Sequence, residues 1–120
     1  MERRKKKVLI ADDDPAVLDF LTIFLEGVGY GVESTGDGAR LETFPADMPD
    51  LLLLDIRMSG WNGCDLCRRL KSQETTRQLP IVLFSANKEV ETMAREAGAD
   101  DFLAKPFDLE VLLEKIERWL

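Results

Sequence analysis

The sequence contains no histidine. Without an imidazole side chain, the chain cannot use a histidine general base or a Ser-His triad, and it cannot carry a phosphohistidine. Only two cysteines are present, Cys64 and Cys67, in C-x-x-C spacing. With no further cysteine or histidine they cannot complete a tetrahedral metal site, and the long polar turn before them is atypical of a thioredoxin-like redox pair. We therefore expect two reduced cysteines packed along a helix.

The chain also lacks an excess of positive charge and a long hydrophobic run. Its formal net charge is −7 and its pI is near 4.6, which argues against nonspecific nucleic-acid binding, because that needs a basic face. No window reaches the roughly 18 apolar residues that a membrane span needs. The basic start leads to only a few apolar residues before Asp12, so no signal peptide is visible. We expect a cytoplasmic protein that contacts neither a membrane nor nucleic acid directly.

The length of 120 residues, with 45% hydrophobic and 32% charged residues, predicts one globular domain over residues 1–120. Residues 1–7 form a basic N-terminal tail and the start of the first strand. A solvated tail is the favoured interpretation of its cluster R-R-K-K-K, and a targeting or phosphate-contact role is the alternative.

The most informative stretch is residues 50–63, D-L-L-L-L-D-I-R-M-S-G-W-N-G. Four leucines run into one carboxylate, Asp55, and a polar turn with two glycines follows. A short apolar run closed by turn residues is typical of a strand buried on both faces. A carboxylate at the end of such a strand needs a cation or a chemical role to hold it there. Asp55 is therefore the centre of the predicted site.

Apolar runs predict five strands, at residues 8–11, 31–35, 50–55, 80–86 and 101–104. Helical spacing predicts five helices, at residues 15–28, 39–44, 62–72 with a fading end to 74, 88–97 and 108–120. The expected capping residues are Asp13 or Asp14 for the first helix, Asn62 for the third and Asp108 for the last. Alternation of short strands with helices predicts an α/β layer fold with right-handed crossovers. In such sheets, ligands bind outside the carboxyl ends of the strands, at the switch point.

Carboxylates, a hydroxyl and an ammonium follow the expected strands directly. They are Asp12, Asp13 and Asp14 after the first strand, Asp55 after the third, Ser85 after the fourth and Lys105 after the fifth. Clustered carboxylates suit Mg2+, a hard cation that prefers oxygen ligands. The lysine could pair with a carboxylate or neutralise an incoming phosphoryl oxygen, and the hydroxyl could donate a hydrogen bond to the same group.

This pattern resembles the receiver domain of bacterial two-component response regulators. The matching segments are V-L-I-A-D-D-D-P, D-L-L-L-L-D-I-R-M-S-G-W-N-G, P-I-V-L-F-S-A and G-A-D-D-F-L-A-K-P-F, in that order, and the resemblance covers residues 8–120. It implies a flavodoxin-like doubly wound (βα)5 three-layer sandwich, with a parallel five-stranded sheet in the order 2-1-3-4-5.

The resemblance also implies a role for each residue near the metal. Asp55 matches the aspartate that accepts a phosphoryl group from a sensor histidine kinase or phosphotransfer protein. Asp13 would ligate Mg2+ directly, Asp12 would hold it through water, and Asp55 and the backbone carbonyl of Arg57 would complete the protein ligands.

The remaining matched positions imply a switch. Ser85 matches the hydroxyl residue that moves onto the phosphoryl group, Phe102 matches the aromatic switch, and Lys105 matches the site lysine, followed by a cis peptide bond to Pro106. Phosphorylation would change the face built from the fourth helix, fifth strand and fifth helix. That face would contact an output domain, a partner or a second copy in a homodimer. Such a protein catalyses only its own phosphorylation and dephosphorylation.

Two departures from the family pattern qualify the expectation. Ser59 stands where the family usually has proline, which predicts a looser loop after Asp55. Val111 and Lys115 stand near positions that offer Glu and Arg for intersubunit salt bridges in the winged-helix subfamily, which disfavours that dimer.

Three other functions are less favoured by the sequence. A degenerate receiver, acting as a phosphorylation-independent interaction module, is the main alternative. A phosphohydrolase using an aspartyl phosphate is disfavoured because Arg57 stands where such enzymes usually carry a second aspartate. A flavin-binding protein is disfavoured because three aspartates after the first strand would repel a phosphate.

Four further side chains have structural interpretations. Asp100 and Asp101 are expected to be surface charges at the entry of the fifth strand, with a partner interface as the alternative. Trp61 is expected to pack within its loop rather than to contact a kinase. Trp119 either closes the last helix against the domain or faces a missing second domain.

Overall fold

The computed structural model describes residues 5–42, 44, 48–58 and 60–120. Five parallel strands form one sheet in the order β2-β1-β3-β6-β7. They are β1 (Lys7–Ala11), β2 (Gly31–Thr35), β3 (Leu51–Asp55), β6 (Ile81–Ser85) and β7 (Asp101–Ala104). Counted along the chain, these strands stand in the order 2-1-3-4-5, so the predicted flavodoxin-like sheet is confirmed.

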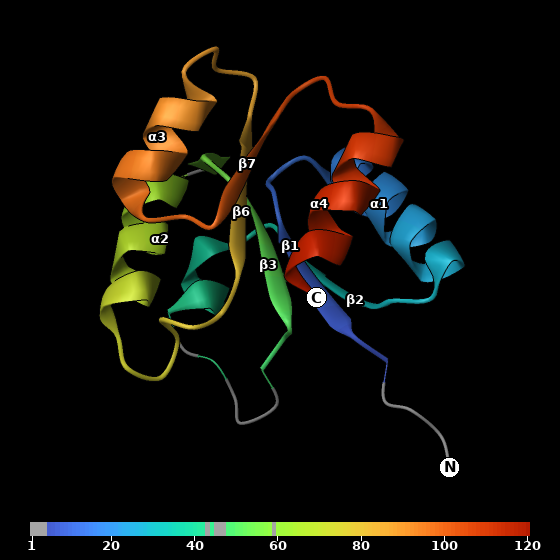
Figure 1. The fold of residues 1–120 in the computed structure, drawn as a ribbon, viewed down its shortest axis with the longest axis horizontal. Helices are drawn as coiled ribbons and strands as arrows, with labels where there is room; N and C mark the ends of the chain where they lie inside the picture. The colour runs from blue at the N-terminus through green and yellow to red at the C-terminus, as the bar shows by residue number, and fades with distance from the viewer. Residues whose placement is uncertain (1–4, 43, 45–47, 59) are drawn as a thin grey trace.

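Helices cover both faces of this sheet. They are α1 (Pro15–Val28), α2 (Gly63–Ser72), α3 (Val90–Ala97) and α4 (Leu109–Trp119). In Figure 1, α1 and α4 lie on one side of the strands, and α2 and α3 lie on the other. None of the helices in the described ranges has the length and hydropathy needed to cross a bilayer.

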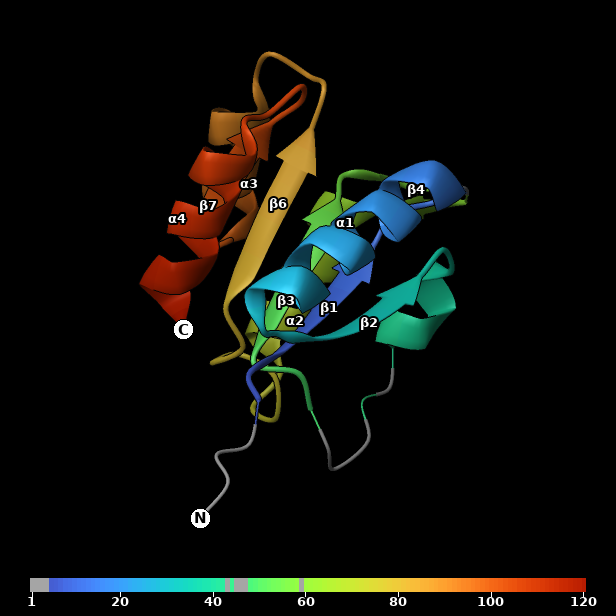
Figure 2. The same cartoon turned by 90° about the vertical axis from the view of Figure 1, so that its right-hand side faces the viewer.

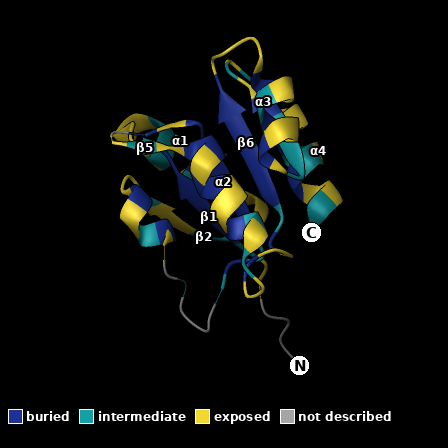
Figure 3. Ribbon diagram, turned by 90° about the vertical axis from the view of Figure 1, so that its left-hand side faces the viewer, coloured by how far each residue is buried: buried dark blue, intermediate teal, exposed yellow. Residues whose placement is uncertain are grey.

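The four leucines of β3 explain why its sequence is apolar without alternation. Leu52 and Leu54 belong to the core cluster shared with α2 and α3, whereas Leu51 and Leu53 belong to the cluster shared with α1 and α4. Successive side chains of a strand point to opposite faces, so a central strand covered on both sides needs apolar residues throughout. Figure 3 shows this arrangement, with buried strands beneath helices whose outer surfaces are exposed.

The helix starts follow the predicted capping residues. The Asp14 carboxylate accepts from the Ala16 N–H at 3.0 Å, and the Asn62 side chain accepts from the Cys64 N–H at 2.8 Å. Asp108 caps α4 in the same way. These caps satisfy N–H groups that have no partner within the helix.

Two local elements differ from the expectation. The helix predicted over residues 39–44 is a 3-10 helix, η1 (Gly38–Leu41), and Thr43 lies outside the described residues. A side chain at Gly38 would collide with the Trp61 ring, so this segment packs closely on the indole. Trp61 therefore has the predicted packing role. The fourth helix begins at Val90 rather than at residue 88.

A short hairpin after β3 was not predicted. It pairs β4 (Arg57–Met58) with β5 (Trp61–Asn62) in antiparallel register. Gly60, in the turn, has a φ of 75°, a left-handed conformation that favours glycine. Ser59 and residues 1–4 lie outside the described residues, so the expectations of a looser loop and of a solvated tail remain predictions.

The cysteines are buried thiols on α2. Cys64 and Cys67 are both free, and burial raises the pKa of the Cys67 thiol to about 12. A thiol with so high a pKa carries almost no thiolate at neutral pH. The predicted packing role along the helix is confirmed.

The interpretation of Asp101 as a surface charge was wrong, whereas Asp100 is only partly buried. An Asp100 oxygen accepts from Lys71 Nζ at 2.6 Å and from the Ile81 N–H at 2.8 Å. The Asp101 side chain is 8% exposed and belongs to a network with residues of α4. Trp119 packs against the core and donates its indole N–H to Asp101 at 3.0 Å, which is the first of its two alternatives.

Candidate functional site

The carboxyl ends of four neighbouring strands open into one pocket of about 590 Å3. Figure 2 shows that the strands run in the same direction, so the loops that follow them gather at one end of the sheet. The pocket is lined by Asp12, Asp13, Asp14, Asp55, Arg57, Ser85, Ala86, Asn87 and Lys105. Every predicted site residue except Phe102 lies there.

Asp55 is the last residue of β3 and is 7% exposed. One carboxylate oxygen accepts from the Arg57 N–H at 3.2 Å, and the other lies 3.4 Å from Lys105 Nζ. Burial and the neighbouring Asp12 carboxylate raise the pKa of Asp55 to about 6, although Lys105 and the Arg57 N–H lower it. Asp55 is therefore mostly ionised at neutral pH but is held in an environment that opposes its charge.

Three carboxylates meet at this point. One oxygen from each of Asp12, Asp13 and Asp55 lies within 4.8 Å of the others. Asp12 is 1% exposed and accepts from the Asp14 N–H at 2.9 Å, whereas Asp13 is exposed. Carboxylate oxygens this close repel one another unless a cation lies among them, and hard divalent cations prefer such ligands. The donor set therefore fits a divalent cation that approaches from the exposed side, next to Asp13.

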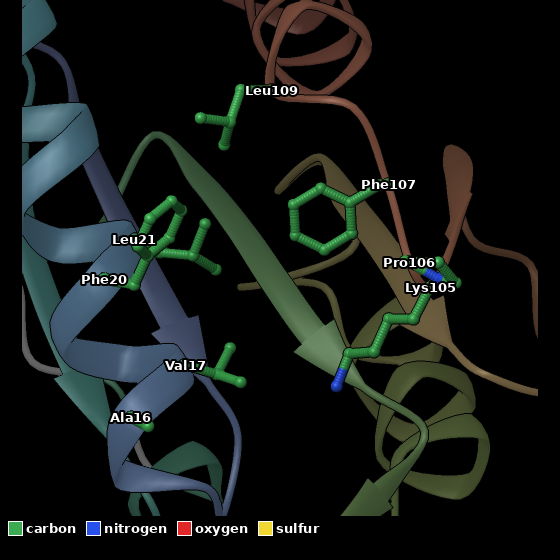
Figure 4. Close-up of a pocket in the computed structure, with 8 residues that line it drawn as sticks. All are labelled: Ala16, Val17, Phe20, Leu21, Lys105, Pro106, Phe107 and Leu109. Atoms are coloured by element: carbon green, nitrogen blue, oxygen red, sulfur yellow. The ribbon is translucent and has the colours of Figure 1, made fainter.

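Lys105 brings an ammonium to the same carboxylates. Its Nζ lies 3.0 Å from an Asp12 oxygen and 3.4 Å from an Asp55 oxygen. In Figure 4 the Lys105 side chain extends past Phe107, with its nitrogen toward the end of the central strand. The Lys105–Pro106 peptide bond is cis, as predicted.

Ser85 ends β6 beside the acidic cluster and is buried. Its Oγ accepts from the Asn87 N–H at 3.0 Å, and the Asn87 side chain accepts from the Glu89 N–H at 2.8 Å. The Ser85 O–H can donate to an anion in the pocket. Asn87 is a pocket residue that sequence reasoning missed. The available signal was an Asn two residues after the hydroxyl, where such residues organise turns.

Phe102 does not lie in this pocket. It is half-buried on β7, and Lys115 Nζ stands 4.5 Å from the centre of its ring. Lys115 also donates to Asp101 at 2.8 Å. The predicted switch position is thus part of a surface formed by α3, β7 and α4.

Replacing Asp101 with asparagine is expected to lower the free energy of unfolding by about 1–3 kcal/mol at neutral pH. Burial alone would raise the pKa of Asp101, but hydrogen bonds from Lys115, Trp119 and the Phe102 N–H outweigh it and lower the pKa below its ordinary value. The ionised carboxylate therefore stabilises the fold above that ordinary value, and this stabilisation is lost as the pH falls through the folded pKa. Urea unfolding followed by circular dichroism at neutral pH and near pH 3 measures both effects.

Asp65→Asn is the matched control for this test, because Asp65 pairs with Arg68 on the exposed face of α2. Its removal is expected to change stability by less than about 0.5 kcal/mol. Equal stabilities of Asp101→Asn and the wild type at neutral pH would contradict the role of the network.

The family model for the response regulator receiver domain matches residues 8–117. Among curated proteins, the DNA-binding dual master transcriptional regulator RpaA of Synechocystis sp. is 35% identical over 117 residues, which are 95% of this chain and 48% of RpaA. The chain spans about half the length of the curated relatives it matches.

Solved structures match over nearly the whole chain. A protein described as a response regulator from Chloroflexus aurantiacus J-10-fl has a TM-score of 0.89 and 32% identity, covering 97% of this chain and 98% of that one. The response regulator TrrA of Thermotoga maritima, in complex with Mg(2+)-BeF, has a TM-score of 0.84 and 27% identity, covering 96% of this chain and 99% of TrrA.

Proposed function

The chain belongs to the family of response regulator receiver domains, and we propose that Asp55 accepts a phosphoryl group from a sensor histidine kinase or a phosphotransfer protein. In this proposal residues 1–120 act as a single receiver domain, a signalling switch that works in the cytoplasm. The degenerate receiver is not supported, because Asp12, Asp13, Asp55, Ser85 and Lys105 all line one pocket.

The observation that carries the proposal is the surroundings of the Asp55 carboxylate. Asp55 lines an open pocket, so a phosphoryl donor can reach it, yet it is buried enough for its pKa to rise to about 6. Lys105 Nζ stands 3.4 Å from one oxygen of the Asp55 carboxylate. A carboxylate nucleophile beside a fixed cation is what transfer of a charged phosphoryl group requires.

Mg2+ fits the donor set of this pocket. Asp13, Asp55 and the backbone carbonyl of Arg57 would hold the ion directly, and Asp12 would hold it through water. When bound, it would neutralise the charge of the phosphoryl oxygens. The complex of TrrA with Mg(2+)-BeF, in a chain of the same fold, supports this choice of metal.

Three residues of the pocket have separate roles in the phosphoryl transfer. An Asp55 oxygen forms the bond to phosphorus as the phosphorus–nitrogen bond of a phosphohistidine donor breaks, and the leaving imidazole keeps the electron pair and takes up a proton. The Lys105 ammonium, which already contacts the Asp12 and Asp55 carboxylates, pairs with a phosphoryl oxygen. The Ser85 hydroxyl, which lines the same pocket, donates to another phosphoryl oxygen.

Phosphorylation would change the conformation of the surface formed by α3, β7 and α4. Movement of Ser85 onto the phosphoryl group would open space for Phe102 to turn inward. The buried residues of α3, Val90, Ala94 and Ala97, are small, which is consistent with an element that shifts at low cost. The surface would adopt an inactive packing before phosphorylation and an active packing after it. To change the ratio of active to inactive molecules from about 1:99 to 99:1, phosphorylation must favour the active packing by roughly 5.5 kcal/mol. An output domain or a second copy would bind this surface, and nucleic acid and membranes would not be bound by this domain directly.

Replacing Asp13 with alanine is expected to weaken Mg2+ binding by more than about tenfold, because a carboxylate ligand and its charge are lost together. Isothermal titration calorimetry with MgCl2 measures the affinity. Asp14→Asn is the matched control, since it removes one charge from the same pocket while asparagine still caps α1. The control is expected to lose less than about threefold in affinity. Unchanged affinity in Asp13→Ala would rule out the assigned ligand.

Beryllofluoride provides the test of the function itself, because it occupies the place of a phosphoryl group on a carboxylate. With Mg2+ and beryllofluoride, we expect chemical-shift changes at Ser85, Lys105 and Phe102, and none of these in Asp55→Asn. A wild-type spectrum that does not change on addition would refute a phosphoaccepting function.

A further inference from the structure

Phe84 lies directly beneath the functional site and is 1% exposed. It stands on β6 in register with Asp55 of β3 and Leu103 of β7. Its ring belongs to the core cluster under α1 and α4, the side of the sheet from which Lys105 reaches the carboxylates. Phe84 has no part in the proposed metal binding, phosphoryl transfer or switch.

The ring of Phe84 faces the Lys105 ammonium. Lys105 Nζ stands 4.6 Å from the ring centroid, within the distance at which an aromatic face attracts a cation. The same nitrogen lies 3.0 Å from Asp12 and 3.4 Å from Asp55. Two carboxylates and one ring face therefore surround the ammonium.

The ring is itself held in place. Phe107 packs against it edge to face, with centroids 6.3 Å apart and an angle of 85° between the planes. Phe107 supports the Phe84 ring and lines the same pocket as Lys105 (Figure 4). A buried ring fixed by its neighbours is a rigid platform for a flexible side chain.

We propose that Phe84 is a positioning residue, whose ring face holds the Lys105 ammonium at the carboxylates. The Lys105 side chain is 24% exposed, so water competes for the ammonium. An aliphatic side chain in place of Phe84 would preserve apolar contact with the lysine stem but would not attract the charge. The ring therefore raises the fraction of time that the ammonium is ready to meet a phosphoryl oxygen on Asp55, a kinetic consequence that rests on the proposed function.

The position of the ammonium can be measured without any phosphorylation. Ring current from Phe84 is expected to move the ε-methylene proton resonances of Lys105 upfield in the wild type, and the displacement is expected to vanish in Phe84→Leu. Lys105→Arg identifies the resonances by their loss. Unshifted ε-methylene protons in the folded wild type would overturn the inference, whatever the protein does with a phosphodonor.

The kinetic role is tested by fluorination of the ring. One, two and three fluorine atoms on the ring of Phe84 withdraw electron density from its face with little change in shape. The maximal rate of phosphorylation by a small phosphodonor with Mg2+ is expected to fall stepwise, by about three- to tenfold over the series, with the donor concentration for half-maximal rate unchanged. The same series at Phe24, which packs against the same core cluster, is the control and is expected to leave the rate unchanged.

The outcomes separate the positioning role from the proposed function. A stepwise loss of rate at Phe84 but not at Phe24 supports the role, because a purely structural ring would not respond to its electron density. A rate independent of fluorination overturns it. If the wild type accepts no phosphoryl group at all, the proposed function fails, and the ring-current measurement alone decides where the ammonium lies.

Discussion

Asparagine in place of Asp55 is expected to abolish phosphorylation and to raise the free energy of unfolding of the metal-free protein at pH 8 by up to about 3 kcal/mol. Phosphorylation is lost because the amide is not a nucleophile for phosphorus. The fold is stabilised because the variant no longer places a negative charge in a buried position beside Asp12. Loss of function and gain of stability in one variant would identify a residue retained for its chemistry.

The higher stability of Asp55→Asn depends on pH, and the direction of the Asp55 pKa shift determines how. Folding raises the pKa of Asp55 from 3.8 to about 6, so the folded state binds the proton more tightly than the unfolded state does. The wild type therefore loses stability relative to the variant as the pH rises from about 4 to about 6, and the loss is complete above that range. Below about pH 4 the wild type and Asp55→Asn are expected to have similar free energies of unfolding, because Asp55 is then protonated in both the folded and the unfolded state.

Urea unfolding in the presence of a chelator, from about pH 4 to pH 8, measures this difference. Asp14→Asn is the control, because Asp14 is exposed at the rim of the pocket and its replacement is expected to give no such pH-dependent gain. A stability difference between Asp55→Asn and the wild type that is the same at every pH would contradict the buried-charge explanation.

Alanine at Gly63 is expected to lower the free energy of unfolding by about 3 kcal/mol and to impair phosphorylation at the same time. The Gly63 N–H donates to the Ile56 carbonyl at 2.7 Å, which brings the start of α2 against the end of β3. A methyl group at Gly63 would lie 2.8 Å from Ile56 Cα and closer still to the Asp55 carbonyl oxygen. Because those atoms belong to the backbone, they cannot move aside without shifting Asp55, the proposed phosphoacceptor.

Gly27, unlike Gly63, has room for a side chain. It lies in α1, and a methyl group there would meet nothing within 4 Å. Gly27→Ala is expected to stabilise the fold by about 0.5–1 kcal/mol, since alanine loses less backbone entropy in a helix. Urea unfolding of both variants gives the comparison, and a Gly63→Ala variant as stable as the wild type would show that the close approach is not needed.

The sheet and most of the site could be predicted because their signals are local. A short run of four leucines closed by turn residues is typical of a strand covered on both faces, and a polar residue directly after a parallel strand lies at the carboxyl edge of the sheet. Asp12, Asp55, Ser85 and Lys105 follow from that rule, and the structure brings them into one pocket. The caps Asp14 and Asn62 act within three residues of themselves, so the sequence is sufficient for them too.

Features that depend on contacts between distant segments could not be predicted. The partners of Asp101 lie 14 to 18 residues later, on a helix whose rotation the sequence does not specify. The β4–β5 hairpin has strands of two residues, too short for any periodic pattern. The contact between Phe84 and Lys105 joins two strand ends, and an apolar pattern alone assigns Phe84 to the core.

Reductive trapping tests the central claim most directly, because borohydride converts an aspartyl phosphate to homoserine and marks the residue that carried it. After incubation with Mg2+ and a small phosphodonor, peptide sequencing by mass spectrometry is expected to find homoserine at position 55 and aspartate at positions 12 and 13. Omitting the phosphodonor or adding a chelator is expected to leave aspartate at all three. Homoserine at position 12 or 13, or at none of the three in the complete mixture, would contradict the assignment of Asp55 as the phosphoacceptor.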